Sequence, residues 1–368
     1  MRKSLMGIAI AAAAAAVAAR AEWYDDMKVK GDVRYRFEHI DEEGKTSQQR
    51  DRVRARVGVF PRLGPNVDAG IQVATGEDKG NKESPTSSNA TLTDGFSGKG
   101  IFLDLAYFDW HTLTGLGLQG GKIKNPFITV SDYVWDGDVN PEGLAVKYAT
   151  GDEIQFLANG GYLWVYERKE DSDDAKMLGA QAALKLKTGD ESHLLAGVSS
   201  YRHQNLEGYG PIDWSDEKKF YGNTSAKTVS GTTTNVLYAT EYSLVEGFAE
   251  AQFDVGLPLV FHAACTVNTD ADADDTAYTA GVLLGKAGDP KTFEVGYNYR
   301  RVEKDSALGA FTDSDSWGGG TDGRGHKLIG RYQLAKNWQF GVAYFLNDKK
   351  IEDSVDYKRL QVDLVAKF

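Results

Sequence analysis

Apolar and polar residues alternate along most of this chain with a period of two. The clearest stretch is RDRVRARVGV at residues 50–59, where arginine stands at every second position from Arg50 to Arg56 and Val53 begins a row of valine and alanine between them. In a β-strand this spacing places the guanidinium groups on one face and the apolar side chains on the other, whereas a helix would scatter the arginines around its axis. The pattern therefore predicts a strand whose charged face requires water, acidic partners or both.

The same alternation recurs often enough to predict about sixteen strands, joined in turn by short turns and long loops. Residues 61–66 and 111–115 are short connections, whereas residues 76–100, 204–242 and 303–325 are long polar ones. The stretch 204–242 is predicted to be one long loop, with or without a short element of its own. An even strand number brings both chain ends to the short-turn side, as in bacterial outer-membrane barrels. The predicted fold is all-β: a transmembrane antiparallel β-barrel in the cell outer membrane, with short periplasmic turns and long extracellular loops.

The charged strand faces favour a closed, water-filled barrel over a soluble β-sandwich. In residues 27–39 one face of the predicted strand carries Lys30, Asp32, Arg34, Arg36 and Glu38. A packed core would not accept such a row unpaired. A barrel of sixteen strands encloses a lumen too wide for side chains to fill, and its closure pairs every backbone group in lipid. The charged faces are therefore predicted to line water and the apolar faces to meet lipid.

The first residues, MRKSLMGIAIAAAAAAVAARAEW, have the parts of a secretory signal peptide: a basic start, a short apolar run and a small-residue cleavage site. We predict cleavage near Ala21, so that residues 1–21 are the signal peptide and residues 22–368 form a single outer-membrane barrel domain. A membrane-anchoring helix is the alternative, but the apolar run is shorter than the roughly 20 residues that a spanning helix needs.

Composition excludes several other functions. The net charge of -11 argues against a nucleic-acid partner, and the single cysteine, Cys265, cannot form an intramolecular disulfide. The six histidines are dispersed, and no HExxH, GxSxG or Walker pattern occurs, so we expect neither an enzyme nor a cofactor. Asp270, Asp272 and Asp274 imitate a calcium loop, but Asp275 stands where that loop needs glycine. We therefore predict no metal site.

Five stretches between Arg34 and Tyr148 resemble a known family. They read RDRVRARVGV, NVDAGIQVATGED, LDLAYFDW, GGKIKNPF and WDGDVNPEGLAVKY, and they look like the Gram-negative "putative porin" family. The resemblance implies an outer-membrane porin that forms a water-filled channel for passive diffusion of small hydrophilic solutes and ions. It also implies a homotrimer, in contact with outer-membrane lipid and lipopolysaccharide.

In the porins that the chain resembles, the third long loop folds into the barrel and narrows the pore. Here that loop is residues 125–143, NPFITVSDYVWDGDVNPEG, in which two prolines restrict the backbone and three aromatic residues are able to pack on the wall. We hypothesise that its acidic residues, Asp132, Asp136, Asp138 and Glu142, face a pore-lining basic wall of Arg34, Arg36, Arg52, Arg54 and Arg56. Such opposed charges would select among ions. The alternative is a solvated outer loop.

Two other functions remain open from the sequence. One is a substrate-specific uptake channel. The other is a surface receptor or adhesion barrel, in which the long loops 204–242 and 303–325 bind a partner. The sequence does not distinguish anion from cation preference.

Overall fold

The computed structural model describes residues 26–77, 84–93, 95–168, 173–212, 214, 219–230 and 232–368 of the 368-residue chain. The predicted signal peptide and its cleavage site lie outside these described residues. No helix among them is long and apolar enough to cross a membrane.

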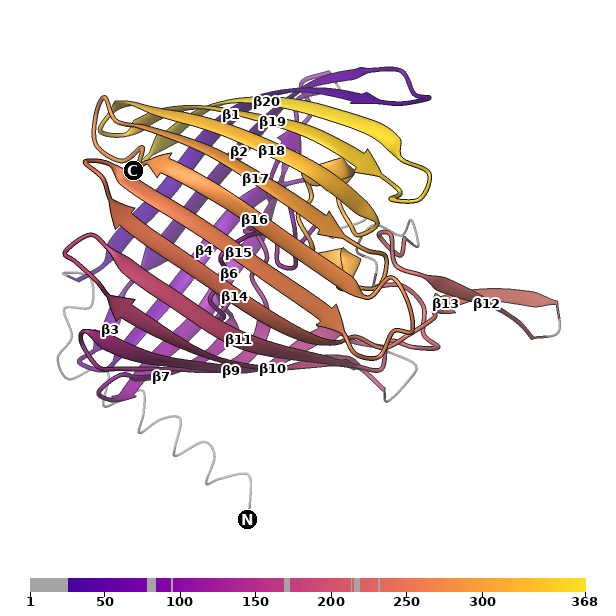
Figure 1. The fold of residues 1–368 in the computed structure, drawn as a ribbon, viewed down its shortest axis with the longest axis horizontal. Helices are drawn as coiled ribbons and strands as arrows, with labels where there is room; N and C mark the ends of the chain where they lie inside the picture. The colour runs from indigo at the N-terminus through magenta and orange to yellow at the C-terminus, as the bar shows by residue number, and fades with distance from the viewer. Residues whose placement is uncertain are drawn as a thin grey trace, which may run out of the picture.

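Sixteen long strands of the described chain form one closed antiparallel sheet (Figure 1). They are β1 (Lys28–Glu42), β2 (Gln48–Phe60), β4 (Val67–Gly76), β6 (Gly100–Leu113), β7 (Leu116–Lys122), β8 (Glu142–Thr150), β9 (Ile154–Tyr166), β10 (Ala175–Lys187), β11 (His193–Gln204), β14 (Ser243–Asp254), β15 (Pro258–Asn268), β16 (Thr276–Gly285), β17 (Phe293–Val302), β18 (Gly323–Ala335), β19 (Trp338–Lys349) and β20 (Val355–Lys367). Two short segments, β3 (Arg62–Gly64) and β5 (Ala90–Thr91), pair with β4 and β2. The predicted barrel of about sixteen strands is confirmed.

The ring closes between the first and last strands, where β1 pairs with β20 as well as with β2. Closure follows from the needs of the backbone, because an unpaired N–H or C=O group in lipid costs several kcal/mol. The register also decides which charges meet. Arg36 on β1 lies opposite Arg52 on β2 and opposite Asp363 on β20, so three neighbouring strands present charged side chains on one face.

The two faces of the strands differ as the alternation predicts. On β10, Met177 and Ala183 are buried inside the barrel, whereas Leu178 and Leu184 on the other face are 44% and 55% exposed. Val57 on β2, which alternates with the arginines, is also exposed. A belt of exposed large apolar side chains around a barrel is typical of a surface that meets lipid.

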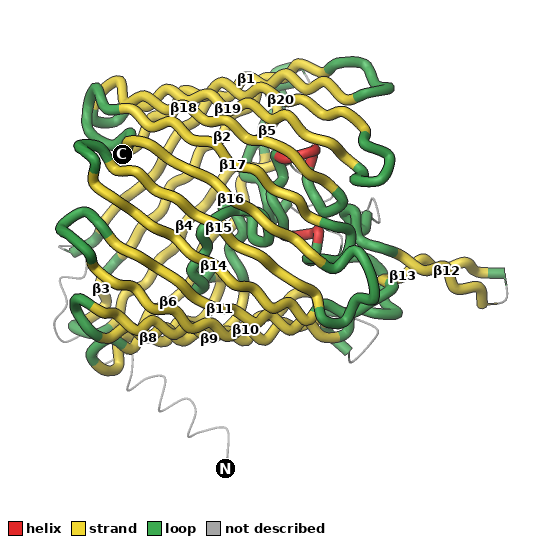
Figure 2. The backbone as a smooth tube through the Cα atoms, viewed as in Figure 1, coloured by secondary structure: helices red, strands yellow, loops and turns green. Residues whose placement is uncertain are grey.

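Long and short connections lie at opposite ends of the barrel (Figure 2). Within the long connection 204–242, β12 (Ser225–Ser230) and β13 (Thr233–Tyr238) form a hairpin that projects away from the barrel (Figure 1). Another long connection contains two single-turn 3-10 helices, η1 (Gly309–Phe311) and η2 (Ser316–Gly318). The stretch 204–242 thus does carry an element of its own.

Much of the apolar core lies inside the barrel and involves two long connections. Phe127 and Trp135 come from the connection between β7 and β8, and Leu308 and Trp317 come from the connection between β17 and β18; all four are buried. We call residues 123–141 the first inward loop and residues 303–322 the second inward loop.

Candidate functional site

The first inward loop crosses the lumen between β7 and β8. Asn140 Nδ2 donates to Asp104 on β6 at 2.6 Å, and the Ile128 amide donates to Gln181 on β10 at 2.8 Å. Further contacts reach β15 and β17 on the other side of the ring. A loop that touches β6, β10, β15 and β17 at once must run through the inside of the barrel.

The sequence of the first inward loop explains this path. Pro126 and Pro141 lack the N–H that would extend a ladder, so they separate the loop from the neighbouring strands. Phe127 and Trp135 are buried, and the Trp135 ring meets Tyr201 of β11 edge-on with 5.6 Å between ring centroids. An edge-to-face pair of this kind adds roughly 0.5–1.5 kcal/mol to the stabilisation from burial. Apolar packing therefore holds the loop against the wall.

The second inward loop, which the sequence predicted as a long polar loop and which the alternative receptor function would use to bind a partner, also lies inside the barrel. Trp317 is buried, and the Phe311 ring stacks on Trp135 with 5.9 Å between centroids and 11° between planes. The Asp136 amide donates to the Phe311 carbonyl at 2.8 Å. The two inward loops therefore pack on each other in the lumen.

Seven inward-facing guanidinium groups form what we call the arginine wall. They are Arg34 and Arg36 on β1, Arg50, Arg52, Arg54 and Arg56 on β2, and Arg359 on β20. Six carboxylates of the described part of the chain lie within 4.0 Å of them: Asp32, Glu38, Glu77, Asp138, Asp315 and Asp363. Seven positive charges thus face six negative charges. The wall is therefore nearly neutral in charge.

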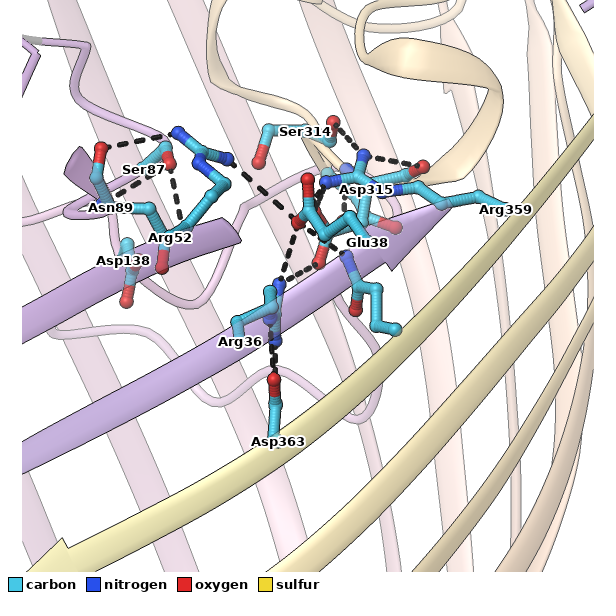
Figure 3. A network of polar contacts seen from close by, with 12 residues as sticks. Arg36, Glu38, Arg52, Ser87, Asn89, Asp138, Ser314, Asp315, Arg359 and Asp363 are labelled. Carbon is cyan, nitrogen blue, oxygen red and sulfur yellow. Dashed lines mark hydrogen bonds and ion pairs between the residues drawn. The ribbon is translucent and has the colours of Figure 1, made fainter. Parts of the chain in front are cut away.

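A buried network around Glu38 lies at the centre of the arginine wall (Figure 3). Glu38 is fully buried, and its two oxygens accept hydrogen bonds from Arg359 at 2.7 Å and from Arg50 at 2.6 Å. Asp315 of the second inward loop lies 2.9 Å from Arg359 and 3.4 Å from Arg36. Ion pairs thus attach the second inward loop to the strands where the barrel closes.

A third segment, residues 84–93, reaches the same wall. Asn89 Oδ1 accepts a hydrogen bond from Arg34 at 2.6 Å, and the Asn89 carbonyl accepts one from Arg52 at 3.1 Å. These predicted pore-lining arginines are therefore held by a neutral amide as well as by carboxylates.

Among the four predicted loop carboxylates, Asp138 is the one that reaches the arginine wall. Its Oδ1 lies 3.4 Å from Arg56 and 4.0 Å from Arg54, and both arginines also pair with Asp32 at 2.8 Å. This is a contact between the first inward loop and β2, as the hypothesis from the sequence requires.

Asp132 pairs with a different part of the barrel. Its two oxygens lie 2.6 Å from Arg300 on β17 and 2.9 Å from Lys327 on β18. Arg300 also binds Asp313 of the second inward loop at 2.8 Å. Burial raises the pKa of Asp132, but the two cations outweigh that effect and bring the pKa below its ordinary value. Arg300 therefore joins both inward loops to the wall through charge.

Asp136 joins the two inward loops through their backbones. Its carboxylate oxygens accept hydrogen bonds from the amides of Asp138 at 2.8 Å and Ser314 at 2.9 Å. Burial, and then the neighbouring carboxylates of Asp313 and Asp138, raise the pKa of Asp136 well above its ordinary value. Asp136 and Asp132 are four residues apart in sequence, and their environments shift the pKa in opposite directions.

Glu142 does not face the arginine wall. It is the first residue of β8 and shares its face with the exposed Leu144. Its carboxylate pairs with Lys122 on β7 at 3.1 Å. The strand begins before the predicted loop ends, and this places Glu142 on the outer surface.

Several charged residues of the site were missed from the sequence. They are Arg300, Lys327, Asp313, Asp315 and Arg359. Arg300 and Arg359 occupy charged positions of alternating strands, which was a usable signal. The aspartates lie in a loop rich in acidic residues, and an apolar run at residues 307–311 was the sequence feature that marked this loop as buried.

The inward loops divide the space inside the barrel. Cavities of about 520 and 190 Å³ lie toward the long loops, and cavities of about 570 and 630 Å³ lie toward the short turns. Trp135, Val139 and Asn140 line both the 520 Å³ and the 570 Å³ cavities. The first inward loop is therefore the partition between the two ends of the lumen.

Solved porin structures share this fold at low sequence identity. The high-pH structure of Pseudomonas putida OprB has a TM-score of 0.60 at 12% identity, covering 94% of this chain and 96% of that chain. Salmonella typhi OmpF in complex with daunomycin has a TM-score of 0.55 at 13% identity, covering 94% and 99%. A triple mutant of Rhodopseudomonas blastica porin has a TM-score of 0.52 at 11% identity, covering 93% and 100%.

Comparison with curated proteins gives no match. A family model described as "Putative porin" matches residues 42–229 and 223–368, which is most of the chain. The match agrees with the closed barrel, its apolar outer face and its charged lumen. The chain belongs to this porin family and is an outer-membrane β-barrel channel for passive diffusion.

Proposed function

We propose that small hydrophilic solutes and ions cross this channel between the first inward loop and the arginine wall, which together form its constriction. The observation that carries the proposal is the 570 Å³ cavity that Arg54 and Arg56 of the wall line together with Val139 and Asn140 of the loop. Asp138 of the loop also lies 3.4 Å from Arg56. Fixed charges of opposite sign across a narrow wet passage create a field that orients dipolar solutes and influences which ions enter. Asp138, Arg54 and Arg56 are the residues to which we assign this role.

The near balance of charge at the arginine wall supports a channel with weak ion preference. Among the residues that the structure describes, seven guanidinium groups face six carboxylates within 4.0 Å. A strongly selective pore needs a ring of one sign of charge. We expect a small reversal potential in a salt gradient for the unmodified protein.

Reversal potentials in planar bilayers test the assignment. Arg56→Glu should shift the reversal potential toward cation selectivity, because the passage then loses one positive charge and gains one negative charge. Arg62→Glu is the matched control: Arg62 is exposed near a short turn and donates to the Pro65 carbonyl, so it makes the same change in total charge away from the wall. An equal shift in both variants would show that net charge, and not the wall, sets selectivity.

A receptor or adhesion function is not favoured, because the second inward loop is buried in the lumen. We assign no catalytic role to any residue. Liposome swelling with sugars of graded size tests passive diffusion directly. Swelling rates should fall with sugar size, whereas a plugged receptor would admit none of the sugars.

We further infer that the protein is exported by cleavage near Ala21, assembles as a homotrimer and contacts lipopolysaccharide. The signal-like N-terminus and the porin family support this inference. N-terminal sequencing of the mature protein and chemical cross-linking in isolated outer membranes test it. A mature chain that begins at Met1, or cross-linking that stops at monomers, would contradict it.

A further inference from the structure

The barrel wall has an opening near the long-loop end, between β6 and β9. The strand β7 ends at Lys122, opposite Ala106, although β6 continues to Gly100. On the other side β8 begins at Glu142, opposite Trp164. Residues 100–105 of β6 therefore pair with β4 but have no strand partner among the described residues on the β7 side. We call this opening the window.

The 520 Å³ cavity extends through the window. Its lining includes Leu103 and Trp164, which have the outward parity and are 53% and 50% exposed. It also includes Leu163 and Met177, which point inward and are buried, and Trp135 of the first inward loop. A cavity lined by both faces of the wall connects the lumen with the outer surface of the barrel. Its volume and its largely apolar lining suit a small organic molecule.

The charges around the window leave one carboxylate without a cation. Glu142 pairs with Lys122 at 3.1 Å, and Asp138 pairs with the arginine wall. Asp104 lines the cavity too, but its oxygens accept hydrogen bonds from the side-chain amides of Gln72 and Asn140, each at 2.6 Å. No cation of the described residues lies within ion-pair distance of Asp104. The cavity thus combines an apolar surface with an uncompensated negative charge.

We propose that the window binds small amphipathic cations, in which an ammonium group is attached to an apolar, ring-bearing body. The ammonium group lies near Asp104, and the ring lies against the apolar lining that Trp135 and Met177 help to form. Aromatic faces in the lining add to the attraction for a cation. Neutral sugars and anions lack one of the two features. This inference rests on the proposed channel function and names a solute class for it.

Block of single-channel potassium chloride current by three probes tests the proposal. Phenethylammonium carries both features, ethylammonium carries the charge alone, and 2-phenylethanol carries the ring alone. Phenethylammonium should block at a concentration about fivefold lower than either of the others, because each of the others lacks one of two contributions of about 1 kcal/mol. Equal block by phenethylammonium and ethylammonium would overturn the proposal.

Variants locate the site. Asp104→Asn should raise the blocking concentration of phenethylammonium about fivefold and leave that of 2-phenylethanol unchanged. Asp109→Asn is the matched control: it lies on the same strand and accepts an amide hydrogen bond from Gln119 at 2.7 Å, but it lines a different cavity. Phe102→Ala, on the apolar side of the cavity, should weaken both ring-bearing probes. The same loss in both aspartate variants would overturn the proposal.

The controls separate this proposal from the channel function. Failure of the channel function appears as absence of potassium chloride conductance before any probe is added, and conductance of each variant shows that it has folded. Binding of phenethylammonium to the detergent-solubilised monomer, without block of the reconstituted channel, would mean that another chain covers the window. That outcome would overturn the proposal for the membrane-embedded protein.

Discussion

Two sides of the lumen hold the first inward loop by different chemistry. At the β17–β18 side, Asp132 is held by Arg300 and Lys327 at 2.6 and 2.9 Å. At the β14–β15 side, the next residue, Tyr133, donates its hydroxyl to Glu246 at 3.0 Å. The other donors to Glu246 are hydroxyl groups on β11, and no cation of the described residues lies within ion-pair distance of it.

Adjacent residues of one loop are thus anchored by an ion pair and by hydroxyl hydrogen bonds. An ion pair weakens when salt screens it and when either group titrates. A buried hydroxyl bond has a fixed geometry and keeps its donor over the physiological pH range. We therefore expect salt to act mainly on the β17–β18 anchor, while the β14–β15 anchor responds mainly to loss of its acceptor.

The largest expected effect comes from removing the shared cation of the ionic anchor. Arg300→Leu leaves Asp132 and Asp313 without the guanidinium group that binds both. Breaking a buried pair by removing one partner costs about 3–5 kcal/mol. Urea unfolding of the barrel in lipid vesicles measures this loss. Arg301→Leu is the control, because Arg301 pairs with Glu303 on the opposite face and should cost less than about 1 kcal/mol. Equal losses would mean that burial of the pair is irrelevant.

A smaller effect is expected at the hydroxyl anchor. Glu246→Leu removes the acceptor for Tyr133, Ser199 and Tyr201, and unsatisfied buried donors should destabilise the barrel by about 2–4 kcal/mol in the same urea assay. Glu246→Gln keeps one acceptor oxygen and should cost about half as much. If the loss in either variant changed strongly with salt, the distinction between the two anchors would be wrong.

The sequence predicted the barrel well because its evidence was repeated in every strand. A period of two, such as Arg50 to Arg56 against Val53 to Val59, is a property of the backbone and fixes which face each side chain occupies. The even number of strands then brings both chain ends to the side of the short turns. The main differences are at the strand ends. This mattered at Glu142, because β8 begins two residues earlier than predicted and Glu142 therefore lies on the outer surface and not in the lumen.

The site was predicted less well because loop placement depends on partners that are distant in sequence. Asp138 lies beside Arg56, but nothing local in the sequence distinguished it from Asp132, whose partners are Arg300 and Lys327. Residues 303–322 were not predicted to lie inside the barrel, because glycine and aspartate are common in surface loops. Here their polar groups are satisfied inside the barrel, as when Arg300 binds Asp313.

A pH titration sharpens the comparison within the first inward loop. The pKa of Asp136 is raised, so its neutral form is favoured when the two inward loops are packed together. The neutral Asp136 side chain stabilises the packed loops fully below the ordinary aspartate pKa of about 4, and this stabilisation is lost as the pH rises through the raised pKa. The pKa of Asp132 is lowered, so its ionised carboxylate stabilises the loop at every pH above about 4. This stabilisation is lost only in stronger acid.

Single-channel noise should therefore increase as the pH is raised from about 4, because ionised Asp136 faces Asp313 and Asp138 and loosens the packed loops. Asp136→Asn keeps the side chain neutral and should flatten this response. Asp270→Asn, on an exposed loop, should leave the response unchanged. A response that persists in Asp136→Asn would assign the titration to another group.

The smallest expected effect is at Glu142, which the sequence placed at the constriction and the structure places on the outer face. Glu142→Gln removes a half-exposed pair with Lys122, which should cost no more than about 0.5 kcal/mol in urea unfolding. The reversal potential in a salt gradient should stay unchanged, because the lost charge is not between the loop and the arginine wall. Asp138→Asn removes the same charge from the contact with Arg56 and should shift the reversal potential toward anions. A shift of equal size in Glu142→Gln would place both carboxylates in the conducting path.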